Sequence, residues 1–279
     1  MPDSTGRGHA TLRGTMKLLL HGATGRVGLA ITRLAHNSPE FAIVGAVCSS
    51  VDPGQGRDIG ELAGVGPMGV VATADLGSGL LGADCIIDFS VPSAVPGLLA
   101  IAARQHLPVV SGTTSLDSAG RQALEKAAES IPVLWAPNMS LGIQVLAELV
   151  THALRRLGSG YDPEIVEIHH RRKLDAPSGT AGRLADAVRS ARSDVEDVHG
   201  RVGEVGLRSD HELGLHAVRG GDVVGDHTVY LLGPGERLEL THRATSRELF
   251  AHGALRAARF VAKHPPGLYS MADVLERAS

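Results

Sequence analysis

The segment from Glu164 to Ala181 carries the chain's densest group of side chains that could do chemistry. It reads EIVEIHHRRKLDAPSGTA, with two imidazoles, then three cations, then the sequence PSGT. Histidine can hold or release a proton near neutral pH, and cations and a helix N-terminus both bind carboxylates. The segment therefore favours a site for a substrate with more than one carboxylate. A basic strand edge followed by an ordinary capped helix is the alternative interpretation.

Metal binding is a weaker interpretation of the two histidines. His169 and His170 are adjacent on an expected strand, so their side chains face opposite ways. No cysteine cluster or HExxH motif accompanies them in the sequence, although zinc sites usually show such spacing. We therefore expect no metal site.

Two further polar residues lie on expected strands. Arg219 either lines the substrate side of the site or pairs with Asp222 on the sheet. His227 is expected to pack within its strand, and Gly220 and Gly221 are expected to form a turn between strands.

A second motif, LLLHGATGRVG, places Gly22, Gly25 and Gly28 between an apolar run and a helical pattern. In dinucleotide-binding folds such glycines allow a tight turn, a close approach of the backbone to the pyrophosphate, and close packing of helix on strand. The spacing is GxxGxxG rather than GxGxxG, so the position at the start of a strand-helix series carries the prediction. The alternative is a purely structural glycine turn.

The end of the second strand bears on which dinucleotide is bound. An acid there would select the ribose 2′-hydroxyl of NAD, but the strand ends in Ser49 and Ser50, and Asp52 comes later. Arg26 could meet a 2′-phosphate, or it could be a solvated residue at the helix start. We expect NADPH to be preferred and NADH to be accepted.

The first half of the chain alternates apolar strands with amphipathic helices. The predicted strands are 16–20, 41–48, 85–89, 108–111 and 133–136, with a short one near Val70 in the irregular region 51–80. The predicted helices are 26–36, 94–102 and 117–130. Such alternation specifies a parallel sheet covered on both faces. We therefore predict an α/β fold with a doubly wound, Rossmann-type parallel sheet.

The pattern changes after Asn138. Helices are predicted at 141–157, 178–192 and 247–263, and strands at 164–170, 213–219, 226–232 and 238–244. Three successive strands without helices between them indicate a second α+β domain with a mixed or antiparallel sheet. Residues 16–139 with 247–279 then form the dinucleotide-binding domain, residues 140–246 form the second domain, and residues 1–15 form a disordered leader or an upstream start.

Composition narrows the class of protein. The net charge is −3, so no strong basic field favours nucleic acid as a partner. No apolar run approaches the roughly 18 residues of a membrane span, and the first residues do not resemble a secretory signal. Cys48 and Cys85 lie in apolar runs, and we expect buried thiols rather than a disulfide. With aromatic residues at 3%, the core must be packed with Val, Leu, Ile and Ala. A cytoplasmic enzyme is expected.

Six segments together carry a family resemblance. They are GATGRVG (22–28), IDFSVPSAV (87–95), SGTTSL (111–116), APNMSLGI (136–143), HHRRKLDAPSGTA (169–181) and VRGGDVVGDHTV (218–229). In order and spacing they resemble the 4-hydroxy-tetrahydrodipicolinate reductases, also called dihydrodipicolinate reductases, of the diaminopimelate and lysine pathway. The resemblance covers most of the chain from Met16 onward, and HHRRKLDAPSGTA is its most specific motif.

The resemblance implies a role for each matching residue. His169 and Lys173 would be catalytic, as proton donor and as its support on the substrate, and His170, Gly179 and Thr180 would bind substrate. The implied cofactor contacts are Gly22, Thr24, Gly25, Arg26, Val27, Gly28, Ser49, Gly112, Thr113, Thr114, Ala136, Asn138 and Met139. The chain departs from the family pattern at Ser49, where an acid is frequent, at Met139, where an aromatic is common, and at Ser115, where glycine is frequent.

The resemblance also implies an activity. A hydride from the nicotinamide and a proton from His169 would reduce a small dicarboxylate ring between two closing domains. The family further implies a homotetramer formed through the second domain's sheet. Two other interpretations remain open: the chain is a related Rossmann reductase for another imino or keto acid, or it is a dinucleotide-sensing protein without catalysis. The sensor would be expected to have lost the His/Lys pair, which is present here.

Overall fold

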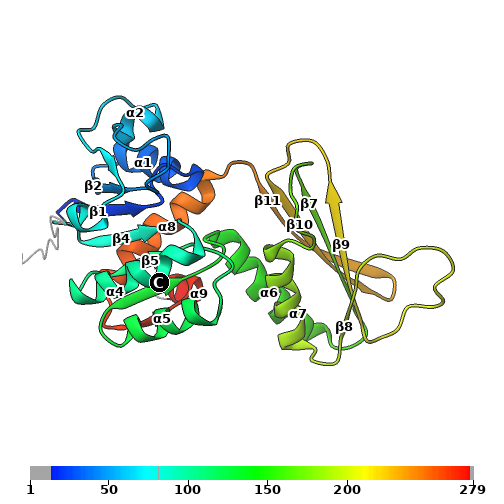
Figure 1. Cartoon of the computed structure of the whole chain (residues 1–279). Helices are drawn as coiled ribbons and strands as arrows, with labels where there is room; N and C mark the ends of the chain where they lie inside the picture. Colours follow the sequence, from blue (N-terminus) through cyan, green and yellow to red (C-terminus); the bar gives the residue numbers. More distant parts are fainter. Residues whose placement is uncertain (1–13, 81, 277–279) are drawn as a thin grey trace, which may run out of the picture.

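The structure, a computed structural model, describes residues 14–80 and 82–276 (Figure 1). The expected leader, residues 1–15, lies outside this part of the chain except for its last two residues. The first group of strands comprises β1 (Met16–His21), β2 (Phe41–Val47), β3 (Ala72–Thr73), β4 (Cys85–Asp88), β5 (Val109–Ser111), β6 (Pro132–Trp135) and β12 (Gly267–Tyr269). The associated helices are α1 (Arg26–His36), α2 (Ile59–Ala63), α3 (Leu76–Gly79), α4 (Val95–Arg104), α5 (Ser118–Ala128), α8 (Glu248–Val261) and α9 (Met271–Glu276).

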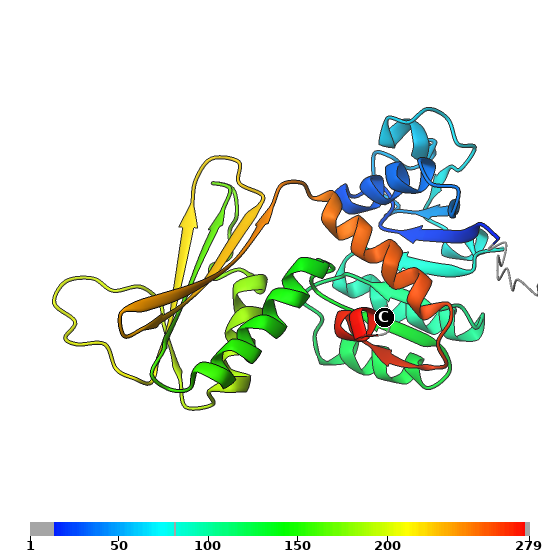
Figure 2. The same cartoon turned by 180° about the vertical axis from the view of Figure 1, so that it is seen from behind.

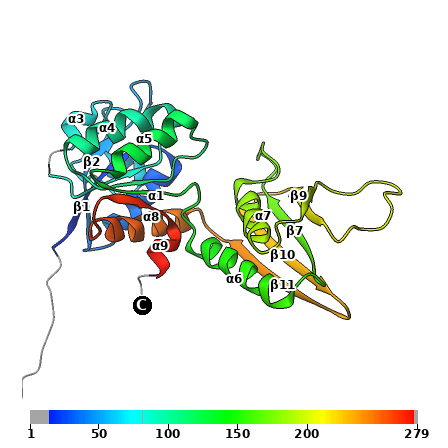
Figure 3. The same ribbon diagram turned by 90° about the horizontal axis from the view of Figure 1, so that it is seen from below.

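These strands form one seven-stranded sheet in the order β12-β6-β5-β4-β1-β2-β3. Every neighbouring pair is parallel. Viewed from below, α4 and α5 lie on one side of the sheet and α1 and α8 on the other (Figure 3). The predicted doubly wound parallel sheet is therefore confirmed. Its order reverses between β1 and β4, which is the point where such sheets bind ligands at their carboxyl edge.

The second group contains α6 (Leu141–Leu157), β7 (Asp162–His169), α7 (Gly179–Ala191), β8 (Glu196–Val198), β9 (Glu212–Arg219), β10 (Gly225–Gly233) and β11 (Glu236–Ala244). Its sheet runs β11-β10-β7-β9-β8. β10 is antiparallel to both neighbours, whereas β9 is parallel to β7 and β8, so the predicted mixed sheet is confirmed. α6 and α7 cover one face, and among the described residues no helix covers the other (Figures 1 and 2).

The core is built from small and branched aliphatic side chains, as the low aromatic content predicts. α8 shows the consequence: Ala251, Ala254, Ala257 and Ala258 are buried on it. A Cβ at Gly253 would lie 1.8 Å from the carbonyl oxygen of Met139. Small residues thus let α8 approach the sheet closely, and they fix the chain just before α6.

The C-terminal segment returns to the first sheet. α8 packs against α1, and β12 pairs with β6 as the seventh strand. The sequence patterns missed β12, α9, β8 and the short helices α2 and α3, and the strand expected near Val70 begins at Ala72. Cys48 and Cys85 are buried free thiols. None of the described helices is both long and apolar enough to cross a membrane.

Candidate active site

The glycine loop between β1 and α1 packs tightly against its own backbone and against the backbone that follows β4. Gly22 has φ +76°, and a Cβ on it would lie 2.4 Å from the carbonyl oxygen of Phe89. A Cβ on Gly28 would lie 2.4 Å from the carbonyl oxygen of Ala23. Gly25 is the N-cap of α1, and no side chain caps this helix within the described residues. The first N–H groups of α1 therefore point out of a bare loop, which fits a pyrophosphate.

The loop after β2 has serines where a ribose-binding acid would stand, and its one nearby carboxylate, Asp52, is turned toward the glycine loop. Ser49 and Ser50 are exposed. Asp52 accepts hydrogen bonds from Thr24 Oγ1 at 2.8 Å and from the N–H of Gly54 at 2.7 Å. Its carboxylate thus braces the glycine loop, and the Thr24 hydroxyl is turned toward it. Arg26 is exposed beside this loop.

A buried carboxylate, Asp88, joins the loops at the carboxyl edge of the first sheet. It is fully buried and contacts His21 Nδ1 at 2.7 Å, Ser90 Oγ at 2.6 Å, Ser111 Oγ at 2.6 Å and Thr113 Oγ1 at 2.7 Å. Burial raises the pKa of Asp88, but these hydrogen bonds outweigh it and hold the pKa below its ordinary value. One anion therefore holds the ends of β1, β4 and β5 together.

The residues expected around the nicotinamide divide into backbone and side-chain roles. Thr113 is buried and its hydroxyl is occupied by Asp88. Met139 is 1% exposed and belongs to the core, and Ala136 is also buried, so these residues can offer a ligand only backbone atoms. Thr114 is exposed. Gly112 leaves room for the Phe89 ring, which would contact a Cβ there at 2.2 Å.

Asn138 links the half of the molecule that contains the first sheet to the half that contains the second sheet. Its Nδ2 donates to Thr180 Oγ1 at 2.7 Å, and its Oδ1 accepts from the N–H of Ser140 at 2.8 Å. Asn138 follows β6, whereas Thr180 lies in the first turn of α7. The half that carries the glycine loop and the half that carries HHRRKLDAPSGTA are therefore joined by a direct hydrogen bond, beside the position expected for the substrate.

His169 ends β7 and is buried against a second carboxylate. Its Nδ1 contacts Glu167, which lies two residues earlier on the same strand face. Arg219 donates to both Glu167 oxygens, at 2.8 and 3.1 Å. Burial lowers the pKa of His169, Glu167 raises it, and Lys173 and Arg219 lower it, with a net lowering. Of the two alternatives for Arg219, pairing with Asp222 is wrong, because the guanidinium faces Glu167 from the parallel strand β9.

The loop after β7 carries the other expected substrate residues. Lys173 Nζ lies 2.9 Å from an Asp175 carboxylate oxygen. His170 donates its backbone N–H to the carbonyl of Val223 at 2.8 Å. Its Nδ1 is buried and has no hydrogen-bond partner among the described residues. The Lys173 side chain is thus paired with Asp175, whereas His170 is held by its backbone and its buried Nδ1 is unpaired among the described residues.

The PSGT sequence starts α7 with an open N-terminus. Ser178 is the N-cap, and its Oγ accepts from the N–H of Ala181 at 3.1 Å. Gly179 is exposed, and a Cβ on it would meet nothing within 4 Å. Bare N–H groups at the positive end of a helix can bind a carboxylate, and Thr180 adds a hydroxyl.

Three histidines form a row across β7, β10 and β11. His227 stands opposite Glu167 on one side and His242 on the other, and its ring meets that of His169 edge-on at 5.1 Å. His227 is buried, as expected, and burial lowers its pKa to about 4, helped by His169. Glu167, His169 and His227 lie close enough to share a cation, but Arg219 already holds both Glu167 oxygens, so we assign no metal there.

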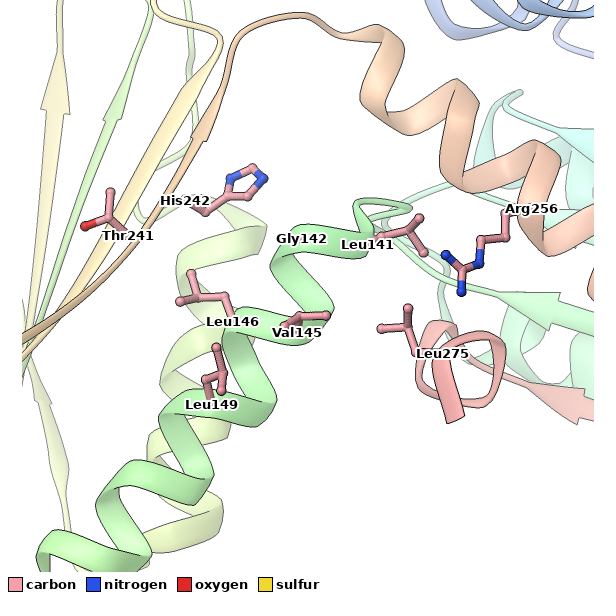
Figure 4. A pocket seen from close by; sticks show the side chains of 9 residues that line it. All are labelled: Leu141, Gly142, Val145, Leu146, Leu149, Thr241, His242, Arg256 and Leu275. Atoms are coloured by element: carbon pink, nitrogen blue, oxygen red, sulfur yellow. The ribbon is translucent and has the colours of Figure 1, made fainter. Parts of the chain in front are cut away.

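A pocket of about 470 Å³ lies between α6 and β11 on one side and α8 and α9 on the other (Figure 4). Leu141, Val145 and Leu149 give it an apolar wall, and Arg256 supplies its cation. His242 faces it, but none of the expected site residues lines it. The pocket therefore meets the histidine row only at His242 and includes none of the residues expected to bind cofactor or substrate.

Sequence reasoning missed the two carboxylates that organise the site. Glu167 could have been found as an acid two positions before His169, because alternate residues of a strand share a face. Asp88 could have been found as a charge ending the apolar run CIID. Ser178 donates its backbone N–H to Glu167 Oε1 at 3.0 Å, and no sequence signal reveals that bond.

Comparison with known proteins identifies the family. The family described as "Dihydrodipicolinate reductase, N-terminus" matches residues 16–139, and "Dihydrodipicolinate reductase, C-terminus" matches residues 142–275. A protein of Anaeromyxobacter dehalogenans named 4-hydroxy-tetrahydrodipicolinate reductase is 47% identical over 263 residues, which covers 93% of this chain and 97% of that one. A Methanopyrus kandleri protein of the same name is 49% identical over 259 residues, with 91% and 94% covered.

Solved structures agree on the fold. Dihydrodipicolinate reductase from Paenisporosarcina sp. TG-14, solved with dipicolinate bound, has a TM-score of 0.74 at 21% identity and covers 94% of this chain and 99% of its own. An amine dehydrogenase from Mycobacterium smegmatis has a TM-score of 0.59 at 14% identity, with 95% and 97% covered. The fold is thus shared with other oxidoreductases, and the sequence motifs and matched family domains decide the assignment. The chain belongs to the dihydrodipicolinate reductase family.

Proposed function

We propose that the chain reduces 4-hydroxy-tetrahydrodipicolinate to tetrahydrodipicolinate with a nicotinamide cofactor, in diaminopimelate and lysine biosynthesis. The observation that carries the proposal is the junction of the two halves. Asn138 joins the strand edge of the first sheet to Thr180 at the start of α7, and Glu167 joins that start to His169. A bare glycine loop, a proton-bearing ring and a carboxylate site thus share one connected frame.

The second half of the frame suits a dicarboxylate. The N–H groups at Gly179 and Thr180 bind one carboxylate, and Lys173 and His170 bind the other. Lys173 exchanges its ion pair with Asp175 for the substrate. The dipicolinate bound by the Paenisporosarcina relative is a ligand of this chemical class. His169, its Nδ1 occupied by Glu167, delivers its proton from Nε2. A Cβ on Gly225 would lie 3.0 Å from that atom, so the glycine keeps the space beside Nε2 free.

The first half holds the cofactor. The reduced nicotinamide supplies the hydride when it is bound. Gly22, Gly25, Val27 and Gly28 hold the pyrophosphate through the loop and the start of α1. Gly112 and Thr114 lie beside the nicotinamide, together with backbone atoms of Thr113, Ala136 and Met139. Closure of the two halves through Asn138 excludes water.

NADPH is the preferred cofactor in this proposal. Asp52 accepts hydrogen bonds from Thr24 and Gly54, so its carboxylate is turned toward the glycine loop. Ser49 and Arg26 are exposed near the expected ribose, and a guanidinium suits a 2′-phosphate. NADH lacks that phosphate and should bind more weakly.

Residues 16–139 with 247–279 make the dinucleotide-binding domain in this proposal, and residues 140–246 make the substrate-binding and oligomerisation domain. The sheet face turned away from α6 and α7 carries Val218 and Leu232, both exposed. Such apolar positions favour self-association, and the assembly proposed from the family resemblance is a tetramer of a cytoplasmic enzyme. Light scattering on the wild type and on Val218→Glu would test the assembly.

A coupled assay tests the activity. The preceding synthase would make the substrate in place from pyruvate and aspartate semialdehyde, and the loss of reduced-nicotinamide absorbance would be followed with NADPH and with NADH. We expect substrate-dependent oxidation, faster at low concentrations of NADPH than of NADH. If neither cofactor is oxidised by protein that binds NADPH, the chain reduces another imino acid or only senses the dinucleotide.

A further inference from the structure

Glu167 is a carboxylate that the proposed reaction does not use directly. It lies on β7 and is 1% exposed. A buried carboxylate is costly unless every oxygen has partners. Both Glu167 oxygens are occupied, by His169, by the backbone of Ser178 and twice by Arg219. These contacts fix two parts of the site, the His169 ring and the start of α7.

One oxygen of Glu167 fixes the imidazole of His169. A carboxylate can only accept here, so Nδ1 carries the hydrogen and Nε2 becomes the atom that faces a ligand. The ring is also confined by His227, which meets it edge-on. Glu167 therefore selects both the orientation and the tautomer of His169.

The other oxygen fixes the start of α7. It accepts the backbone N–H of Ser178 at 3.0 Å, and Ser178 is the N-cap whose hydroxyl in turn accepts from Ala181. The next two residues, Gly179 and Thr180, carry the proposed carboxylate site. Movement of Glu167 would thus shift the ring and the carboxylate site relative to each other.

Arg219 offsets the electrostatic cost of burying Glu167 and adds a contact to the loop after β7. Its guanidinium neutralises Glu167, and its second nitrogen also donates to the carbonyl of Asp175 at 2.7 Å. The loop that carries Lys173 is therefore attached to the same carboxylate. Burial raises the pKa of Glu167, whereas Arg219, Ser178 and His169 lower it more, so the group stays ionised.

We propose that Glu167 is a positioning residue: a single carboxylate sets the tautomer of His169 and holds the start of α7, so that proton donor and carboxylate site keep a fixed geometry. The kinetic consequence rests on the proposed function. The consequence for the imidazole does not, because the tautomer of His169 exists without substrate.

The test is Glu167→Gln in the full chain. His169, Ser178 and Arg219 donate to two carboxylate oxygens in the wild type, whereas the amide of the variant has one acceptor oxygen. The amide NH₂ is a donor, so it favours the tautomer of His169 in which Nδ1 is an acceptor. We expect kcat to fall by up to about 100-fold, the loss typical of a small misplacement of a catalytic group, while the Kd of NADPH changes less than about twofold. Without the anion the pKa of His169 falls, so the alkaline limb of the kcat/KM profile should move to lower pH. Long-range ¹H–¹⁵N NMR should show the His169 proton moving from Nδ1 to Nε2, with the signal assigned by its loss in His169→Gln.

Glu164→Gln is the matched control. Glu164 lies on the same strand and is buried, and it pairs with Arg201, Arg208 and His216, but it points to the opposite face. It should lower stability and leave kcat and the His169 tautomer unchanged. Equal losses of activity in both variants, or wild-type kcat in Glu167→Gln, would overturn the proposal.

The wild-type spectrum provides a test that needs neither folding of the variant nor turnover. A proton on Nδ1 of His169 supports the proposal, and a proton on Nε2 in the neutral ring overturns it. Failure of the proposed function would instead leave the wild type without substrate-dependent NADPH oxidation, whatever the tautomer.

Discussion

The two sheet edges that meet at the site are each organised by one buried carboxylate, but for different ends. Asp88 binds His21 and three hydroxyl groups, and it holds loops that present mainly backbone atoms to a ligand. Glu167 binds an arginine, an imidazole and a helix cap, and it holds side chains that titrate or carry charge. Under the proposed function this difference is a division of labour: the first edge presents a cofactor, and the second supplies the substrate's charges and proton.

The largest effect on this division is expected when a charge is removed from the second edge. Lys173→Met should lower kcat/KM for the dicarboxylate about 10³-fold, because loss of a desolvated charge partner costs about 2–5 kcal/mol. The Kd of NADPH, measured by fluorescence titration, should not change. Lys126→Met, on the exposed face of α5, should leave both quantities at wild-type values. A matching loss of NADPH affinity in Lys173→Met would break the division.

Acid should affect the two edges at different pH values. His227 has a pKa of about 4 in the folded state, against about 6.5 when unfolded. Between these values the unfolded chain binds a proton that the folded chain does not, so the unfolding free energy falls as pH drops from about 6.5 toward about 4. The loss approaches about 3 kcal/mol. Asp88 has its folded pKa below the ordinary value, so its contribution is lost only in stronger acid.

Denaturant unfolding from pH 7 to pH 4.5 measures this effect. His227→Gln should flatten the curve, and His152→Gln, an exposed position on α6, should not. An unchanged slope in His227→Gln would show that His227 is not the group responsible.

A backbone clash at the first edge should have the converse effect to Lys173→Met. In Gly28→Ala the new Cβ would lie 2.4 Å from a backbone oxygen, and overpacking of this kind costs about 1–3 kcal/mol. We expect weaker NADPH binding by about tenfold, or about 1.4 kcal/mol, with kcat at saturating NADPH unchanged. Gly97→Ala is the control, because it lies in α4 with nothing within 4 Å and should be neutral or stabilising by up to about 1 kcal/mol.

The smallest effect concerns the choice of cofactor. Arg26→Ala should raise the Kd of NADPH up to about fivefold, since an exposed ion pair contributes at most about 1 kcal/mol. The Kd of NADH serves as the internal control and should stay the same. Equal weakening of both cofactors would show that Arg26 acts on the shared pyrophosphate and not on a 2′-phosphate.

Strong local patterns made much of the fold predictable from the sequence. The bounds expected for α1 and α6 match the structure, because an apolar stripe with a 3.6-residue period identifies a helix without tertiary information. β12 could not be predicted in this way. It has three residues and forms because β6 offers an unpaired edge.

The candidate site was predictable only as far as its motifs. His169, Lys173 and the glycine loop lie in short segments whose residue types indicate their chemistry. The partners of Arg219 and Asp88 depend instead on strand register and on which loops converge. That information is distributed over distant parts of the chain, which is why Asp222 was the wrong partner for Arg219.

The most direct test of the division of labour is to measure kcat and the Kd of NADPH on one protein, His169→Gln. Loss of a positioned proton donor should lower kcat about 10²- to 10⁴-fold. The Kd of NADPH should stay within about twofold of the wild-type value, because the cofactor contacts proposed above lie on the other sheet's edge. A loss of NADPH affinity as large as the loss of kcat would contradict the account and remove His169 as the proton donor.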